Sequence, residues 1–152
     1  MKTFNQLIEE ARSKVKELFP WDVEDHLNNN KLLIVDIREP YEFDVMHIKG
    51  SINVPRGVLE TSCEYDFEET VPELVEARND TVLLVCRSGN RSLLAADVMQ
   101  QMGYQHVFSL KTGLRGWNEA DQPLVDTDNK TVDIDDADKY FLPKLRSEQL
   151  KP

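Results

Sequence analysis

The sequence is poor in several residue types, and each deficit excludes a class of protein. It holds only two cysteines in 152 residues, so a disulfide framework is excluded and we expect a reducing, cytoplasmic location. It has 18 basic and 28 acidic residues, which give a net charge of −10. This negative charge argues against nucleic acid or an anionic membrane as a binding partner. No segment approaches the roughly 18 apolar residues of a membrane-spanning helix. The N-terminal stretch has scattered charges and no apolar core, unlike a signal peptide.

What the sequence does contain is an alternation of short apolar runs and helix-like segments. The apolar or β-like runs are residues 31–36, 51–54, 81–86 and 106–110. The helix-like segments are residues 41–47, 67–78, 91–102 and 112–119. Near-continuous apolar runs are typical of strands buried on both faces of a parallel sheet. The alternation therefore predicts an α/β fold in one compact domain, with ligands bound beyond the carboxyl ends of the strands.

We expect three segments along the chain. Residues 1–20 predict an amphipathic helix that begins with a capping box at Thr3 and Gln6 and ends at Pro20. Its apolar stripe is expected to dock on the domain or on a second subunit, because its basic residues are offset by acidic ones and do not favour a membrane surface. Residues 21–125 form the main domain.

The remaining segment, residues 126–152, is an acidic tail. Residues 118–138 hold eight acids and one lysine, and such a charge run predicts a solvated segment. An EF-hand calcium loop is excluded, because Thr131 stands where glycine is required and Ala137 stands where glutamate is required. Scattered apolar residues near the end indicate one docked turn or short helix.

Cys86 is the candidate with the clearest chemistry. It ends an apolar strand and is followed by Arg-Ser-Gly-Asn-Arg-Ser and a helix-like segment. A sulfur at such a junction faces the unpaired backbone N–H groups of the first helical turn. Helix N-termini and nearby cations, here Arg87 and Arg91, favour the thiolate form of a cysteine. We therefore predict that Cys86 is a nucleophile.

The loop after Cys86 has a composition suited to holding an anion. Gly89 and Asn90 tolerate a left-handed backbone, which allows the loop to curl into a nest of N–H groups. A buried structural cysteine is the alternative interpretation, but such a residue has no need of two arginines and a glycine beside it. We expect an exposed loop whose cradle consists of Arg87, Ser88, Gly89, Asn90, Arg91 and Ser92.

Four segments stand in order along the chain. They are Asp36-Ile-Arg-Glu-Pro-Tyr-Glu-Phe43, His47-Ile-Lys-Gly-Ser-Ile-Asn-Val-Pro55, Val85-Cys-Arg-Ser-Gly-Asn-Arg-Ser92 and Gly113-Leu-Arg-Gly-Trp117. Together they resemble the single-domain rhodanese family of sulfurtransferases. The resemblance implies a rhodanese fold, with a five-stranded parallel sheet and helices on both faces. It also implies that Cys86 cycles through a persulfide held by the backbone N–H groups of residues 87–92.

The resemblance implies an activity as well. The Cys86 thiolate would take a sulfane sulfur from an anionic donor, such as thiosulfate or a persulfide, and pass it to cyanide or a thiol in a ping-pong cycle. Arg87 and Arg91 would bind the donor's oxygens. This chemistry needs no metal and no organic cofactor. Proteins that donate or accept sulfur are further candidate partners, whereas nucleic acid and membrane are not expected.

Two alternatives stay open. One is a non-catalytic rhodanese module that binds partners through its N-terminal helix and acidic tail, although an intact Cys86 and a complete loop count against it. The other is a phosphatase or arsenate reductase. Rhodanese-like members of those classes carry a Cys-x5-Arg loop, whereas the arginine here follows as Cys-x4-Arg and Ser92 occupies the next position. The shorter loop favours a sulfane sulfur over a tetrahedral oxyanion.

Other residues of the four segments are predicted to have supporting roles. Asp36 and Arg38 are expected to tie together the loops near the cysteine, the alternative being an ordinary surface ion pair. His47 and Trp117 are expected to pack rather than to react, and Arg56 is placed at the pocket rim, where it could recruit an anionic donor.

The second cysteine, Cys63, lies in a polar, acidic stretch that does not activate a thiol. We interpret it as an unreactive thiol. The alternative is a resolving thiol that forms a disulfide with Cys86 under oxidation.

Overall fold

The computed structural model describes residues 1–29 and 31–152. A five-stranded parallel sheet with the strand order β1-β5-β4-β2-β3 runs through the described chain. The strands are β1 (Lys16–Leu18), β2 (Leu32–Asp36), β3 (Ile52–Asn53), β4 (Thr81–Val85) and β5 (His106–Leu110). The predicted α/β fold with a five-stranded parallel sheet is confirmed.

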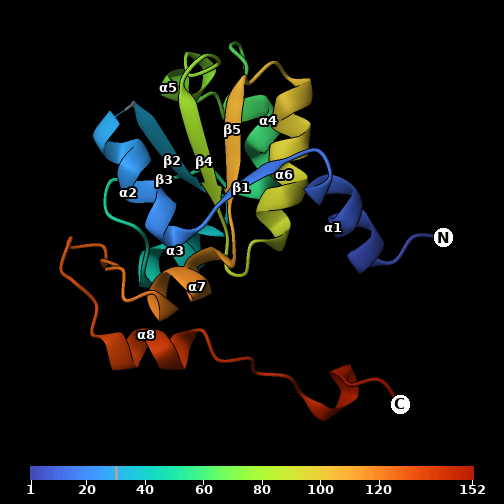
Figure 1. Ribbon diagram of the computed structural model, residues 1–152, viewed down its shortest axis with the longest axis vertical. Helices are drawn as coiled ribbons and strands as arrows, with labels where there is room; N and C mark the ends of the chain where they lie inside the picture. Colours follow the sequence, from blue (N-terminus) through green and yellow to red (C-terminus); the bar gives the residue numbers. More distant parts are fainter. Residues whose placement is uncertain (30) are drawn as a thin grey trace.

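Helices cover both faces of this sheet (Figure 1). One face is packed by α1 (Phe4–Arg12), α4 (Leu59–Ser62), α5 (Pro72–Val75) and α6 (Asn90–Gln101). The other face is packed by α2 (Pro20–Asn29), α7 (Gly113–Glu119) and α8 (Ile134–Tyr140). The remaining helical turns are α3 (Pro40–Val45), η1 (Arg56–Val58) and η2 (Ser147–Gln149). Within the described part of the chain, no helix is both long enough and apolar enough to cross a membrane.

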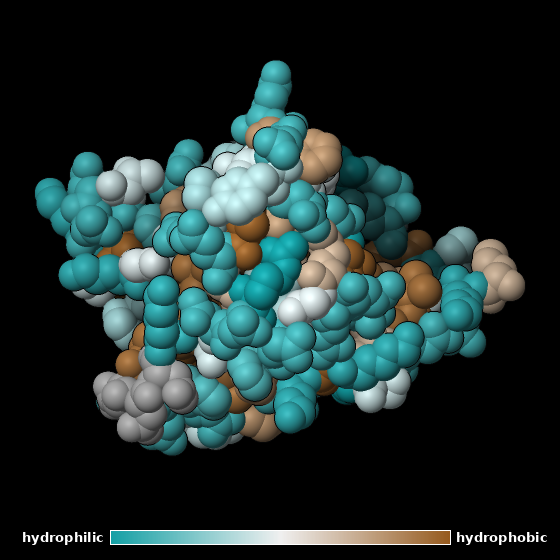
Figure 2. Space-filling model, turned by 90° about the horizontal axis from the view of Figure 1, so that it is seen from above, coloured by the Kyte–Doolittle hydropathy of each residue, from teal (hydrophilic) through white to brown (hydrophobic). Residues whose placement is uncertain are grey.

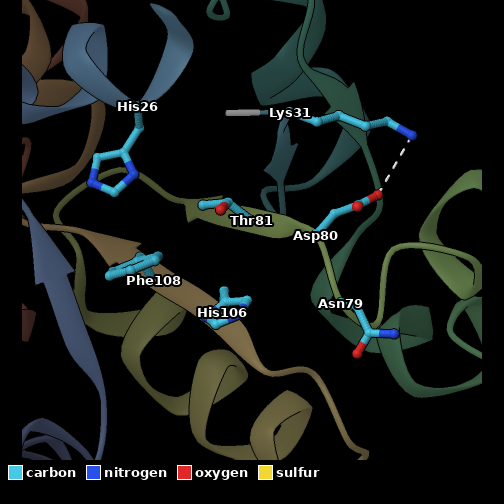
Figure 3. Close-up of a pocket in the computed structure, with 7 residues that line it drawn as sticks. All are labelled: His26, Lys31, Asn79, Asp80, Thr81, His106 and Phe108. Carbon is cyan, nitrogen blue, oxygen red and sulfur yellow. Dashed lines mark ion pairs between the residues drawn. The ribbon is translucent and has the colours of Figure 1, made fainter. Parts of the chain in front are cut away.

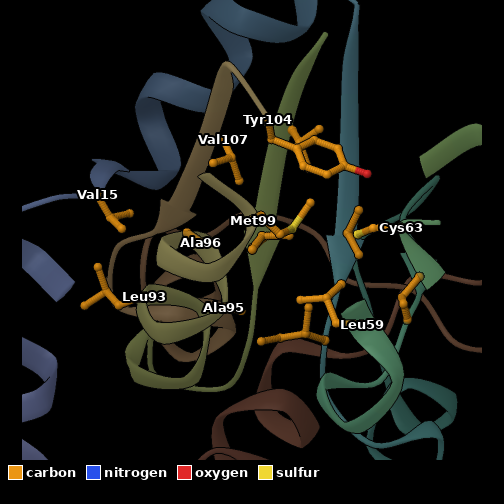
Figure 4. Close-up of a cluster of buried hydrophobic side chains, with 14 of the residues drawn as sticks. Val15, Leu59, Cys63, Leu93, Ala95, Ala96, Met99, Tyr104 and Val107 are labelled. Atoms are coloured by element: carbon orange, nitrogen blue, oxygen red, sulfur yellow. The ribbon is translucent and has the colours of Figure 1, made fainter. Parts of the chain in front are cut away.

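The central strand β4 shows why its sequence is apolar at every position. Its side chains alternate between two buried clusters: Val82 and Leu84 lie on the α6 side, whereas Leu83 and Val85 lie on the α7 side. Figure 4 shows the first cluster enclosed between the sheet and its helices. Both faces exclude water, as expected for a parallel sheet with helices on both sides. Cys86 follows directly and belongs to the cluster on the α6 side.

The N-terminal segment differs from its prediction. α1 ends at Arg12 instead of running to Pro20, and β1 pairs in parallel with residues 108–110 of β5. The edge of β5 offers unpaired backbone groups, and a strand at this position satisfies them. Pro20 begins α2 rather than ending a helix, because proline suits the first helical position. The predicted docking of α1 on the domain is confirmed by its buried residues, Ile8 and Ala11.

The region between β3 and β4 also differs. The helix predicted over residues 67–78 is reduced to the single turn α5, because Pro72 can begin a helix but cannot continue one. The short elements η1 and α4 precede it without having been predicted. In contrast, α3, α6 and α7 lie within a few residues of the helices predicted at 41–47, 91–102 and 112–119.

The C-terminal segment packs against the domain through α8. The prediction of a solvated tail is wrong for this helix, whereas the docked turn or short helix expected near the end of the chain is present. Ala137 and Phe141 are both 2% exposed and lie in the cluster on the α7 side. They are four residues apart, which places them on one face of the helix and leaves the acidic residues outside. Asp133 caps the helix by accepting from two N–H groups of its first turn. Asn118 of α7 donates to Asp138 over 2.6 Å.

This docking can be tested with two neighbouring substitutions. Phe141→Ala removes a buried side chain and should lower the free energy of unfolding by about 3 kcal/mol. Leu142→Ala, at a side chain that is 55% exposed, should change it by less than about 0.5 kcal/mol. Urea unfolding followed by tryptophan fluorescence measures both. Small and equal effects would show that α8 does not pack on the domain in solution.

Candidate active site

Cys86 lies between the end of β4 and the start of α6, and it is 1% exposed. The backbone N–H groups of Gly89 and Ser92 donate to its Sγ atom over 3.2 and 3.4 Å. Ser92 is in the first turn of α6, whose leading N–H groups have no partner inside the helix. The sulfur therefore occupies the position of a helix cap. Negative charge on the sulfur is favoured there by the N–H groups and by the helix dipole.

A pair of buried hydroxyl groups adjoins the same sulfur. Sγ of Cys86 lies 3.3 Å from Oγ of Ser92, which in turn lies 2.7 Å from Oγ of Ser109 on β5. Both serines are 0% exposed. A hydroxyl can donate or accept, so Ser92 can donate to a thiolate while Ser109 donates to Ser92. The sequence analysis missed Ser109, whose signal is a single hydroxyl in an otherwise apolar strand interior.

The start of α7 holds the loop in this shape from the other side. The N–H groups of Leu114 and Arg115 donate to the carbonyl oxygens of Cys86 and Arg87 over 2.9 and 3.0 Å. These bonds tie the start of the loop to the first turn of α7. Gly113 makes the close approach possible: its φ is +62°, and a Cβ atom there would lie 2.5 Å from the main chain of Arg87.

The loop is less exposed than predicted. Gly89 has a left-handed φ of +89° and is buried with Ser92, whereas Ser88 is exposed and Asn90 is half-buried. Arg87 Nη2 donates to the carbonyl oxygens of Phe141 and Leu142, over 2.9 and 3.1 Å. The C-terminal segment therefore lies against the cradle, which is one reason for the low exposure. Beside it is a hollow of about 220 Å³ lined by Tyr41, Glu42, Arg87, Tyr140, Leu142 and Lys144.

Arg91, the second predicted donor-binding cation, is paired with Glu42 of α3. Its Nη1 and Nη2 atoms each lie 3.2 Å from a different carboxylate oxygen of Glu42. Burial raises the pKa of Glu42, but hydrogen bonds from Arg91 and from the Glu39 backbone, with the positive charges of Arg91 and Arg38, bring the pKa below its ordinary value. Glu42 is thus a carboxylate at neutral pH. It was missed, although it stands inside the segment that begins at Asp36.

Asp36 and Arg38 are both 0% exposed, so the alternative of a surface ion pair is wrong. Arg38 Nε and Nη2 donate to the Asp36 carboxylate, and Nη2 also donates to the carbonyl oxygen of Met46 over 2.6 Å. Among the described residues, Nη1 of Arg38 has no hydrogen-bond partner. Asn53 on β3 donates to the carbonyls of Asp36 and Arg38. These bonds fix the turn from β2 into α3, and so the position of Glu42.

The other predicted residues lie apart from the sulfur's hydrogen-bond network. His47 stacks on Phe43 with ring centroids 3.8 Å apart, and its Nδ1 atom lies 2.8 Å from the Phe43 carbonyl oxygen. Trp117 is 5% exposed and donates to the carbonyl of Pro123. Arg56 forms an ion pair with Glu60. Packing roles for His47 and Trp117 agree with the sequence analysis, whereas Arg56 is engaged elsewhere.

Cys63 is 0% exposed and belongs to the apolar cluster drawn in Figure 4. Burial raises the pKa of its thiol, an effect only partly offset by the hydrogen bond to Tyr104 and by the positive charge of Arg78. A raised pKa reduces the thiolate fraction at neutral pH and with it the reactivity of the sulfur. These features support the interpretation of Cys63 as an unreactive thiol.

A further cavity lies at the opposite end of the sheet. Figure 3 shows this space of about 410 Å³ beside the first residues of β4 and β5. Its lining residues are His26, Lys31, Asn79, Asp80, Thr81, His106 and Phe108. Figure 2 looks onto this end, whose surface is mostly hydrophilic. The length of β4 separates the cavity from Cys86. Among the described residues, no group of three or more His, Cys, Asp or Glu side chains could hold a metal ion.

Fold and site together define a class of protein. It is an α/β domain in which a free cysteine follows the central strand, and the sulfur of this cysteine caps the N-terminus of the next helix. The rhodanese-like domain model matches residues 20–120. The chain belongs to the rhodanese-like domain family, as the four segments indicated.

The putative sulfur carrier protein YrkF of Bacillus subtilis is 33% identical over 90 residues, which cover 59% of this chain and 43% of that protein. Thiosulfate sulfurtransferase PspE of Escherichia coli is 32% identical over 73 residues, which cover 48% of this chain and 62% of that protein. The match thus spans less than two thirds of either relative.

Among solved structures, RPA3614 of Rhodopseudomonas palustris, described as a protein of unknown function and possible tyrosine phosphatase, is similar with a TM-score of 0.72 and 29% sequence identity. The similarity covers 82% of this chain and 95% of that one.

The contact between α7 and the loop after Cys86 predicts that two glycine substitutions lower the stability of the protein by different amounts. Gly103→Ala places a side chain on a left-handed backbone with nothing within 4 Å, and should cost about 1–2 kcal/mol of stability. Gly113→Ala adds a clash with the main chain of Arg87. It should lower the stability by more than Gly103→Ala, because the loop of residues 87–92 must move. Thermal unfolding compares the two variants. Equal losses would show that the loop does not depend on this close approach.

The burial of Cys63 predicts that it does not act as a resolving thiol. Mild peroxide treatment of the folded protein should oxidise Cys86 without linking it to Cys63, and Cys63→Ala should oxidise in the same way. Non-reduced peptide mapping detects the products. A Cys63–Cys86 disulfide in the wild type would contradict the prediction and restore the resolving role.

Proposed function

We propose that this protein is a sulfurtransferase that moves a sulfane sulfur from an anionic donor to a thiol or cyanide acceptor through a persulfide on Cys86. The observation that carries the proposal is the position of the Cys86 sulfur. At the start of α6, its Sγ atom accepts hydrogen bonds from two backbone N–H groups. N–H groups that donate to the sulfur stabilise its negative charge when it acts as the nucleophile. The names of YrkF and PspE, a putative sulfur carrier and a thiosulfate sulfurtransferase, support the same class of reaction.

The first half-reaction loads the enzyme. The Cys86 thiolate attacks the outer sulfur of thiosulfate, a new S–S bond forms on Cys86, and the donor's S–S bond breaks. Sulfite leaves with the electron pair of that bond. The cradle of residues 87–92 would then hold the negative terminal sulfur of the persulfide with its backbone N–H groups.

The second half-reaction unloads the enzyme. An acceptor thiolate or cyanide attacks the terminal sulfur of the persulfide, and the S–S bond on Cys86 breaks. The electron pair returns to the Cys86 sulfur, which restores the thiolate. Donor and acceptor use the same site in turn, so the kinetics should be ping-pong. Neither half-reaction needs a metal or an organic cofactor.

Arg87 is the cation best placed to attract the donor. Its guanidinium now binds the neutral carbonyl oxygens of Phe141 and Leu142. Charge-assisted bonds to the donor's oxygens are stronger than bonds to neutral carbonyls, so an arriving anion can exchange with them. Arg91 contributes less than the sequence suggests, because Glu42 offsets its charge.

A second candidate activity comes from the description of RPA3614 as a possible tyrosine phosphatase. The loop counts against it, because Cys86 and Arg91 are separated by four residues and leave a narrow cradle. A non-catalytic module is the third candidate. The hydrogen bonds converging on Cys86 count against a module, since a scaffold does not need them.

The proposed function is tested by mass spectrometry under non-reducing conditions after incubation with thiosulfate or a small persulfide. The Cys86 peptide should gain one sulfur atom, and cyanide or a thiol should remove it. Cys86→Ala should abolish loading and transfer, whereas Cys63→Ala should load like the wild type. A folded wild type that gains no sulfur from either donor contradicts the proposal, and Cys86-dependent hydrolysis of an aryl phosphate would then favour the phosphatase.

A further inference from the structure

Arg38, Arg87 and Arg91 differ in the charge that they can offer to a donor. Arg38 is fully buried against Asp36, and Arg91 is held by both oxygens of Glu42. Arg87 instead donates to main-chain carbonyl oxygens, which carry no net charge. Two of the three positive charges are therefore balanced locally by carboxylates. The cradle is less cationic than the sequence of its loop indicates.

Glu42 is the carboxylate that balances Arg91, a residue of the cradle. Its side chain is 13% exposed and borders the same hollow as Arg87. Oε2 also accepts from the backbone N–H of Glu39 over 3.0 Å, which completes the cap of α3 and fixes the carboxylate in place. A fixed and largely buried charge is screened by salt much less than an exposed one. It therefore acts on any anion that approaches Cys86.

The candidate donors differ in charge. Thiosulfate is a dianion, whereas the persulfide of a neutral small thiol carries a single negative charge. A negative charge on Glu42 repels both donors, but it repels the dianion more strongly, because the dianion carries one more negative charge than the persulfide. It also competes with the donor for the guanidinium of Arg91, which could otherwise bind sulfonate-type oxygens in a forked geometry.

We propose that Glu42 is a specificity-determining residue, which disfavours dianionic donors such as thiosulfate and so selects singly charged persulfides. The inference rests on the proposed function, because it concerns the loading of Cys86. Glu42 does not touch the reacting sulfur in this arrangement; it acts through Arg91 and through its own charge.

The test is Glu42→Gln, which removes the charge but keeps an oxygen for Arg91 and for the α3 cap. The second-order rate constant for loading Cys86 is measured with thiosulfate and with 2-mercaptoethanol persulfide. The ratio of the two constants should shift by about tenfold toward thiosulfate, which corresponds to about 1.4 kcal/mol. The interaction energy between two unit charges several ångströms apart, at an effective dielectric constant of about 20, is of this order. The shift should change little as salt is added, because a largely buried charge is only weakly screened.

Asp44→Asn is the matched control, because Asp44 is an exposed acid on the same helix; its donor ratio should equal that of the wild type. Equal changes for both donors in Glu42→Gln would assign Glu42 a structural role and overturn the inference, as would an unchanged ratio. Thermal unfolding of each variant identifies a loss of folded protein. Failure of the wild type to load from either donor is a different result, since it overturns the proposed function itself.

Discussion

The structure depends on the contact between one sulfur atom and the beginning of one helix. Two backbone N–H groups, one from the loop and one from the first turn of α6, donate to Cys86 Sγ, so the sulfur and the start of the helix hold each other in position. The strand supplies the other half of the constraint, because β4 is packed on both faces and fixes where the chain emerges. α7 then binds the carbonyls of the same loop. Strand, loop and two helix N-termini thus determine one another.

Charge pairing is the second theme of the site. The loop sequence contains two arginines, which suggests a strongly cationic pocket. Glu42 on α3 reduces that charge by pairing with Arg91, whereas Asp36 at the end of β2 balances Arg38, which lies outside the loop. A buried ion pair is costly to form and still more costly to break, so these pairs also hold the loops in register. The same carboxylates therefore contribute to stability and limit the attraction of anions.

Much of this arrangement follows from sequence pattern, but only where the pattern is local. The apolar runs predict β2, β4 and β5 because a strand buried on both faces has no polar alternation. Cys86 and its loop are recognisable because the residue types of a helix-initiating nest are contiguous. β1 is not predictable in this way, since three residues that pair with a distant strand look like the end of an amphipathic helix. Contacts between distant segments, such as Ser109 with Ser92 or Arg87 with Phe141, leave only faint signals.

The docking of α8 has a consequence for the size of the working unit. The matched family region covers residues 20–120, yet β1 lies before it, while Phe141 and the carbonyls that Arg87 binds lie after it. A fragment trimmed to the matched region would lose an edge strand and expose part of the core beside α7. The smallest piece of this chain that preserves the surroundings of Cys86 therefore runs from α1 to Leu142, well beyond the borders that family resemblance would suggest.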